Sequence, residues 1–190
     1  MKSRYGIGSK FQSSFSLQFS QSPHESLTEQ TSPMLLQNNL PVRFYNKCKI
    51  LIVDDDPFNV FSLKQLLCLF KLPDFDQRIV TAFNGVEAIE AIESNLNQTG
   101  QQVTSSIGLV ITDCNMPVMD GFEASKSIIN LLDQRGVDRD RQPVIVALTG
   151  HVEPEYKHKA KANGIQRVYS KPITKEILQN LLVELRFEVQ

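Results

Sequence analysis

From residue 49 onward the sequence predicts an α/β protein, in which a parallel sheet of five strands carries helices on both faces. Two observations lead to this fold class. Apolar runs that are too short for helices alternate with segments in which apolar residues recur at helical spacing. Turn residues or polar clusters also separate these segments, as expected where a strand ends at the edge of a sheet. Such alternation is typical of parallel strands joined by right-handed helical crossovers.

The first 46 residues differ from the rest in composition. They hold nine serines by position 32 and several glutamines, with Glu25 and Glu29 as the only acids. The scattered Phe11, Phe15 and Phe19 cannot bury enough area to offset chain entropy. We therefore expect residues 1–46 to be a disordered Ser/Gln-rich tail or linker and residues 47–190 to form the folded domain. An organelle transit peptide is not expected, because basic residues are few.

The first strand, expected over residues 49–53, leads into Asp54-Asp55-Asp56 and a helix that begins at Pro57. The apolar residues of this helix recur at helical spacing: Phe58, Phe61, Leu66, Leu67 and Phe70. A second strand over residues 78–82 precedes the turn pair Asn84-Gly85. The helix that follows has the apolar face Val86, Ile89 and Ile92. We expect residues 94–106 to form a polar loop.

The third strand, residues 107–112, ends in Asp113, and a helix begins beyond Gly121 with the inner side Phe122, Ile128, Ile129 and Leu132. Next come a polar loop over residues 134–142, a strand over residues 144–148, and a helix from Pro154 to the Asn163-Gly164 cap. A short strand over residues 167–170 and a last helix capped by Thr174 complete the pattern. The last helix has one apolar stripe: Ile177, Leu178, Leu181, Leu182 and Leu185.

Five polar residues follow the predicted strands: Asp54, Asp55, Asp113, Thr149 and Lys171. Because parallel strands end at one edge of a sheet, and ligands bind at that edge, we expect these side chains to form one site. Three close carboxylates repel one another unless a cation neutralises them, and Mg²⁺ is the ion that suits such ligands. A carboxylate beside Mg²⁺, an ammonium and a hydroxyl can attack phosphorus and form an acyl phosphate without a histidine base.

Over residues 49 to about 187 the chain resembles the response-regulator receiver domain of two-component signalling. The residues that carry the resemblance are Val53-Asp54-Asp55, Thr112-Asp113, Met116-Pro117-Val118-Met119-Asp120-Gly121, Ala147-Leu148-Thr149 and Lys171-Pro172. The resemblance implies a doubly wound, flavodoxin-like sheet of order 2-1-3-4-5 with five helices. It also implies a cis bond between Lys171 and Pro172. Asn59, five positions after Asp54, is similar to the receivers of hybrid histidine kinases.

The resemblance also assigns roles to the predicted site. Asp113 would be the phosphoacceptor, Thr149 would bind a phosphoryl oxygen, and Lys171 would pair with Asp113 and then with the phosphate. The implied ligands of the Mg²⁺ cofactor are Asp55, Asp113 and the main-chain carbonyl of Asn115, together with Asp54, which would act partly through water. One departure stands out, because many members of the family have an aromatic residue three positions before the lysine, where this chain has Val168.

The predicted function is that of a phosphorylation-activated receiver in a phosphorelay. A histidine kinase or a histidine phosphotransfer protein would donate the phosphoryl group to Asp113, and the change would reach an unidentified downstream effector. The surface that switches would comprise the fourth helix, the fifth strand and the fifth helix of the predicted pattern. Such a domain is not a multiple-turnover enzyme by itself, although it catalyses its own phosphorylation and dephosphorylation. His151 is a further candidate for contact with the acyl phosphate.

Two alternatives remain open. The chain could be a degenerate receiver that only binds partners, although all five key residues are present. It could also be a Mg²⁺-dependent phosphohydrolase of the haloacid dehalogenase type, which uses a pattern such as Asp54-x-Asp56. Against the second alternative, Pro57-Phe58 replaces the Gly-Thr of that family, and Asp113 would have no role.

Composition excludes several other classes. A formal net charge of -1 argues against general nucleic-acid binding. Three cysteines at wide spacing fit a reduced, cytoplasmic protein better than a disulfide framework or a zinc site. No apolar stretch is long enough to predict insertion into a membrane, although a parent kinase could tether the domain.

Overall fold

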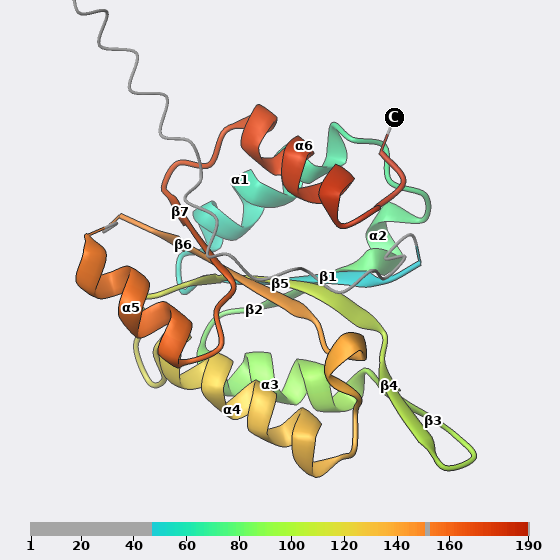
Figure 1. Cartoon of the computed structure of the whole chain (residues 1–190). Helices are drawn as coiled ribbons and strands as arrows, with labels where there is room; N and C mark the ends of the chain where they lie inside the picture. The colour runs from blue at the N-terminus through green and yellow to red at the C-terminus, as the bar shows by residue number, and fades with distance from the viewer. Residues whose placement is uncertain (1–46, 151–152, 190) are drawn as a thin grey trace, which may run out of the picture. The chain divides into compact units, whose positions relative to one another are not determined.

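A computed structural model describes residues 47–150 and 153–189 of the chain. Its centre is a five-stranded sheet of order β2-β1-β5-β6-β7, in which every pair of neighbours is parallel (Figure 1). The strands are β1 Lys49–Val53, β2 Ile79–Ala82, β5 Ile107–Asp113, β6 Val144–Thr149 and β7 Arg167–Ser170. Because β3 and β4 belong to a separate sheet, β5, β6 and β7 are the third, fourth and fifth strands of the main sheet. The predicted fold class and the predicted order 2-1-3-4-5 are therefore confirmed. The tail predicted over residues 1–46, and His151, lie outside the described residues.

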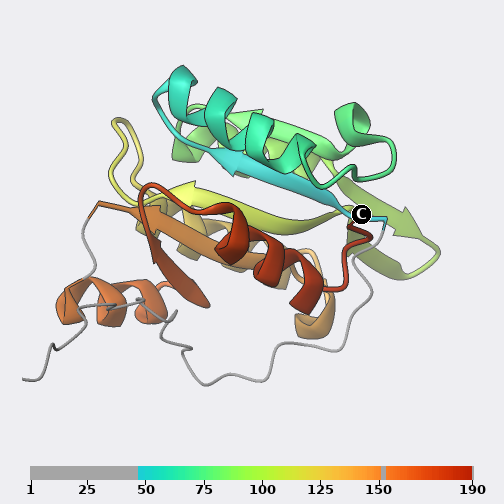
Figure 2. The ribbon, with the colours of Figure 1, turned by 90° about the horizontal axis from the view of Figure 1, so that it is seen from above.

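Helices cover both faces of the sheet, as Figures 1 and 2 show. On one face lie α1 Pro57–Cys68 and α6 Lys175–Glu184, and on the other lie α3 Gly85–Ser94, α4 Gly121–Gln134 and α5 Pro154–Ala162. No helix among the described residues is both long and apolar enough to cross a membrane.

The strands alternate their side chains between two hydrophobic clusters. In β1, Ile52 packs with Leu67 of α1 and Leu182 of α6, whereas Leu51 packs with Ile92 of α3 on the opposite face. All five side chains are buried. A strand buried on both faces reads as a continuous apolar run, which is why the strand segments could be found in the sequence.

The polar loop predicted over residues 94–106 is wrong. This segment forms an antiparallel hairpin of β3 Leu96–Thr99 and β4 Gln102–Ser105, separate from the main sheet. Gly100 supplies the positive φ, 64°, that the turn needs. Leu96 and Val103 pack against the cluster under α3, while residues 97–102, which form the tip of the hairpin, are exposed. Because these two strands bury few side chains, their sequences are mostly polar and lack the apolar run that would predict a strand.

Three further details differ from the expectation. Phe58 and Phe61 were predicted on the apolar face of α1, but their side chains are 71% and 58% exposed, and the helix buries Val60, Leu63 and Leu67 instead. Two short helical segments were not anticipated, α2 Phe75–Arg78 and the 3-10 turn Arg139–Arg141. Single turns are too short to produce a periodic pattern.

Candidate functional site

The ends of the parallel strands bring most of the predicted site residues together. Asp54 follows β1, Asp113 is the last residue of β5, Thr149 is the last residue of β6, and Lys171 follows β7. The side chains of Asp54 and Thr149 are buried, and those of Asp113 and Lys171 are partly buried. Asp55 and Asn115, in contrast, are exposed.

Lys171 joins two of the carboxylates. Its Nζ atom lies 2.7 Å from Asp54 Oδ2 and 2.8 Å from Asp113 Oδ2. Burial acts to lower the pKa of this lysine, but hydrogen bonds and charge from Asp113 and Asp54 outweigh burial and raise it above its usual range. The ammonium therefore stays charged at neutral pH. The peptide bond from Lys171 to Pro172 is cis, as the resemblance implied.

Asp54 accepts three hydrogen bonds. Besides Lys171, its carboxylate accepts at Oδ1 from the backbone N–H of Asp56, at 3.1 Å, and from the side-chain amide of Asn59, at 3.0 Å. Asn59 lies in the first turn of α1, which begins with Asp56 as its N-cap and Pro57 at its first position. The sequence pattern singled out Asn59 only through the resemblance, and gave it no role in the site.

The chain after β5 turns sharply because Gly121 lies against Asp113. A Cβ atom at Gly121 would stand 2.0 Å from the carbonyl oxygen of Asp113, so no other residue fits without moving the backbone. Gly121 donates its N–H to the carbonyl of Cys114 at 3.1 Å. In the same turn the N–H of Asn115 donates to Asp113 Oδ1 at 3.3 Å. The predicted turn pair Asp120-Gly121 thus holds the loop beside Asp113.

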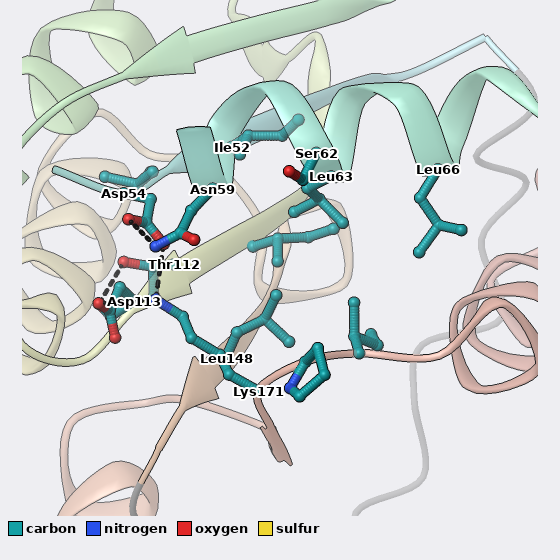
Figure 3. Close-up of a pocket in the computed structure, with 14 residues that line it drawn as sticks. Ile52, Asp54, Asn59, Ser62, Leu63, Leu66, Thr112, Asp113, Leu148 and Lys171 are labelled. Atoms are coloured by element: carbon teal, nitrogen blue, oxygen red, sulfur yellow. Dashed lines mark hydrogen bonds and ion pairs between the residues drawn. The ribbon is translucent and has the colours of Figure 1, made fainter. Parts of the chain in front are cut away.

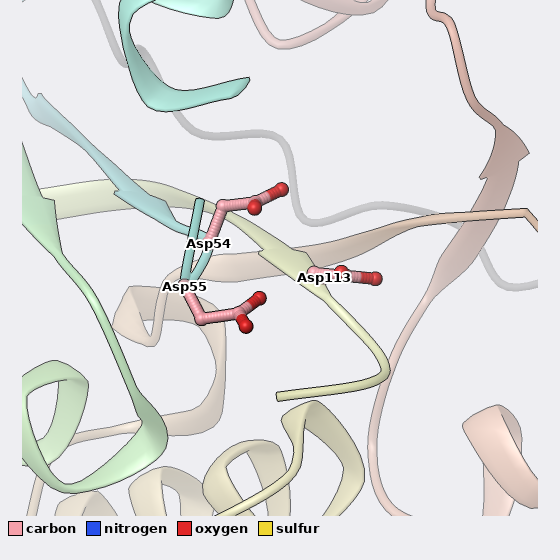
Figure 4. Close-up of side chains that lie close together, drawn as sticks. All are labelled: Asp54, Asp55 and Asp113. Carbon is pink, nitrogen blue, oxygen red and sulfur yellow. The ribbon is translucent and has the colours of Figure 1, made fainter. Parts of the chain in front are cut away.

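A cluster of three carboxylates fits a small divalent cation. One oxygen each from Asp54, Asp55 and Asp113 lies within 4.8 Å of the others, and the three side chains converge on one region in Figure 4. Oxygens that share a Mg²⁺ ion at about 2.1 Å stand at most about 4.2 Å apart. The observed separations, all within 4.8 Å, are close to this spacing. The donor set is all oxygen and carries more negative charge than Lys171 neutralises, which suits Mg²⁺.

A cavity of about 380 Å³ opens beside these groups, between α1, β1, β5 and the segment after β7. At one end it is lined by Asp54, Asn59, Asp113 and Lys171, as Figure 3 shows. The rest of its wall is mostly apolar and includes Leu63, Leu66, Leu148 and Ile173. Thr149 and Asp55 do not line this cavity.

Val168 and Tyr169 point to opposite faces of the sheet. Val168 packs against the cluster under α3 and α4, whereas Tyr169 is buried in the cluster under α1 and α6. The Tyr169 hydroxyl lies 3.5 Å from Arg167, which also pairs with Glu184 of α6. The aromatic ring therefore does not replace the one expected three positions before the lysine, because a shift of one residue in a strand reverses the face.

The model of the response regulator receiver domain family matches residues 50–183. Hybrid signal transduction histidine kinase B of Dictyostelium discoideum is 33% identical over 140 residues, which are 70% of this chain and 6% of that protein. Histidine kinase 5 of Arabidopsis thaliana is 31% identical over 162 residues, 74% of this chain and 16% of that protein. The chain thus spans a small part of these curated relatives.

Solved structures share the fold. One of them is the Saccharomyces cerevisiae co-crystal structure of the histidine phosphotransfer protein Ypd1 and the receiver domain of Ssk1. The matched chain is 26% identical to this chain, with a TM-score of 0.60. That match covers 74% of this chain and 90% of the solved chain.

Proposed function

Because the chain belongs to the response regulator receiver domain family of two-component phosphorelay systems, which is linked to histidine kinases, we propose that Asp113 accepts a phosphoryl group from a phosphohistidine in a Mg²⁺-dependent reaction. The observation that carries this proposal is the pair of contacts from Lys171 to Asp54 and Asp113, at 2.7 and 2.8 Å. These contacts place an ammonium and a second carboxylate directly beside the acceptor.

The transfer needs position and charge more than proton chemistry. One Asp113 oxygen attacks phosphorus, the bond from phosphorus to the histidine nitrogen breaks, and the imidazole leaves. Mg²⁺, when bound, neutralises charge on the phosphoryl oxygens. We assign its binding to the carboxylates of Asp54, Asp55 and Asp113 and to the main-chain carbonyl of Asn115.

Lys171 and Thr149 act on the acquired charge. Lys171 keeps its proton, because its neighbours raise its pKa, and can pair with the phosphoryl oxygens while it remains near Asp113. Thr149 is buried at the end of β6, and its carbonyl accepts from the Lys171 N–H at 2.9 Å. A movement of Thr149 toward the phosphate would therefore pull on the chain after β7. We propose that this movement shifts the equilibrium of the surface formed by α5, β7 and α6.

The proposed donor is a protein, either a histidine kinase or a histidine phosphotransfer protein. The relatives of the chain are histidine kinases, and one solved neighbour is in complex with a phosphotransfer protein. Phe58 and Phe61 of α1 are large, exposed and close in sequence to Asp54 and Asp55. Exposed aromatic side chains beside a reactive group favour a docking surface for a protein donor.

The phosphohydrolase alternative has less support. Asp56, which would be its second catalytic carboxylate, accepts a 2.9 Å hydrogen bond from the N–H of Phe58 and serves as the N-cap of α1. A degenerate receiver that only binds partners is the alternative that the experiment below must separate from a working one.

The test is the intact mass of the protein after incubation with a small phosphodonor, such as acetyl phosphate, with and without Mg²⁺. We expect one phosphoryl addition that needs Mg²⁺ and is lost in Asp113→Asn. The matched control is Asp56→Asn, which removes a neighbouring charge but keeps a good N-cap, and should label like the wild type. Equal labelling of Asp113→Asn and the wild type would contradict the assignment. Labelling of neither protein would favour a binding module, and many turnovers of free phosphate would favour a phosphohydrolase.

A further inference from the structure

Asn59 contacts the candidate site without belonging to the residues proposed for catalysis or metal binding. Its side-chain amide donates to Asp54 Oδ1 at 3.0 Å, whereas Lys171 donates to the other oxygen of that carboxylate, Oδ2, at 2.7 Å (Figure 3). We propose that Asn59 is a positioning residue, which fixes the orientation of the Asp54 carboxylate for Mg²⁺. This inference depends on the proposed Mg²⁺ site.

The contact from Asn59 to Asp54 joins the two ends of the short segment 54–59. Asp54 Oδ1 accepts from the N–H of Asp56 at 3.1 Å, and Asp56 accepts in turn from the N–H of Phe58 at 2.9 Å, so that the backbone passes directly from β1 into α1. Asn59 is the next residue and returns to the same Asp54 oxygen. Two donors from one tight segment therefore hold Oδ1, and the side chain has little freedom to rotate.

The charge of the donor distinguishes Asn59 from Lys171. Asn59 is neutral, so it orients Asp54 without cancelling the negative charge that attracts a cation. Lys171 is shared between Asp54 and Asp113, and in the proposed function it turns from these carboxylates to the phosphoryl oxygens beside Asp113. Asn59 would then keep Asp54 in place while Lys171 moves. A buried carboxylate with a fixed orientation loses less entropy when it binds an ion than one that must first be ordered.

The position of Asn59 matches this role. It lies in the first turn of α1, whose start is fixed by the Asp56 cap and by Pro57. Its side chain is partly buried and lines the polar end of the cavity, next to Asp54, Asp113 and Lys171. Asparagine is a mediocre helix former, so helix propensity alone does not explain its presence here.

The test compares Asn59→Ala with wild type by calorimetric titration of Mg²⁺ into the protein without any phosphodonor. Loss of one hydrogen bond should weaken Mg²⁺ binding about 3- to 10-fold. With acetyl phosphate, the Mg²⁺ concentration for half-maximal labelling should rise by the same factor, while the labelling rate at saturating Mg²⁺ stays within about twofold of wild type. A residue that merely supports the fold would not produce this division between affinity and rate.

The control is Gln65→Ala. Gln65 is exposed on the same helix and does not line the cavity, and its replacement by alanine raises helix propensity as Asn59→Ala does. Its Mg²⁺ affinity should equal that of wild type. If Asn59→Ala binds Mg²⁺ as tightly as wild type, Asn59 is not a positioning residue. If the wild type itself binds no Mg²⁺, the proposed metal site fails, and the two failures are thus distinct.

Discussion

Cys114 follows Asp113 directly in the sequence, yet its environment is that of a core residue. The side chain is 1% exposed and packs in the cluster beneath α3 and α4. Burial, together with the charge of Asp113, raises the pKa of its thiol to about 12. Because the thiolate is the reactive form, this cysteine is inert at neutral pH despite its neighbour.

Thiol labelling should therefore separate the three cysteines. Cys68 is exposed at the end of α1, whereas Cys48 and Cys114 are buried. With iodoacetamide at pH 8 we expect Cys68 to react first and the other two only after addition of denaturant. Peptide mass spectrometry at successive times gives the order of reaction. Cys68→Ser is the control, and should show almost no rapid labelling. Rapid alkylation of Cys114 in the folded protein would contradict the burial described here.

At the scale of the element, α1 has three functions in one helix. Its inner side, Val60, Leu63 and Leu67, anchors it to the sheet. Its first turn presents Asn59 to Asp54, and its outer side exposes Phe58 and Phe61. Its start is set by Asp56, which accepts from the N–H of Phe58, and by Pro57 at the first position. In the run Asp54-Asp55-Asp56, the third aspartate thus caps the helix, while the proposed metal ligands Asp54 and Asp55 precede it.

Replacing Asp56 tests this separation of roles. Asp56→Ala removes the capping hydrogen bond and should lower the free energy of unfolding by about 1 kcal/mol, measured by urea denaturation. Asp56→Ser, which can cap the helix, should recover most of that loss. Mg²⁺ affinity should remain close to wild type in both variants, since Asp56 is not part of the three-carboxylate cluster. A large loss of Mg²⁺ binding in Asp56→Ser would instead make Asp56 a metal ligand.

At the scale of the whole molecule, the sheet separates two hydrophobic clusters, one on each face. Leu182 of α6 is fully buried against the cluster that contains Ile52 of β1 and Tyr169 of β7. Its neighbour Val183 is 54% exposed. Helix α6 therefore holds β1 and β7, the strands that lead to Asp54 and Lys171, in the same packed layer.

This pair of neighbours provides a stability test. Leu182→Ala should lower the free energy of unfolding by about 2 to 5 kcal/mol, because it leaves a cavity in a packed layer. Val183→Ala on the same turn should change it by less than about 0.5 kcal/mol. Both values come from urea denaturation followed by circular dichroism. Equal effects of the two substitutions would show that α6 is not packed as described.

The sequence alone determined most of the main sheet and the identity of the candidate site. Strands β1, β5 and β6 are buried on both faces, so their apolar runs are visible without a partner, and Asp54, Asp113 and Thr149 stand at the ends of these runs. Parallel connections then require Asp54, Asp113 and Lys171 to lie at one edge. The direct contacts from Lys171 to both aspartates agree with that expectation.

Only the tertiary structure decided how individual side chains are used. Helical spacing alone placed Phe58 and Phe61 on the inner face of α1, but the packing of Val60, Leu63 and Leu67 against the sheet turns both outward. The contact from Asn59 to Asp54 depends on the path of the chain between β1 and α1, which spacing does not specify. The β3–β4 hairpin is held by backbone pairing, which leaves little trace in side-chain polarity. The order of apolar and polar residues can be read from the sequence, and it indicates which segments are buried. Hydrogen-bond geometry, and the face that a helix turns toward the sheet, are decided only when the elements pack together.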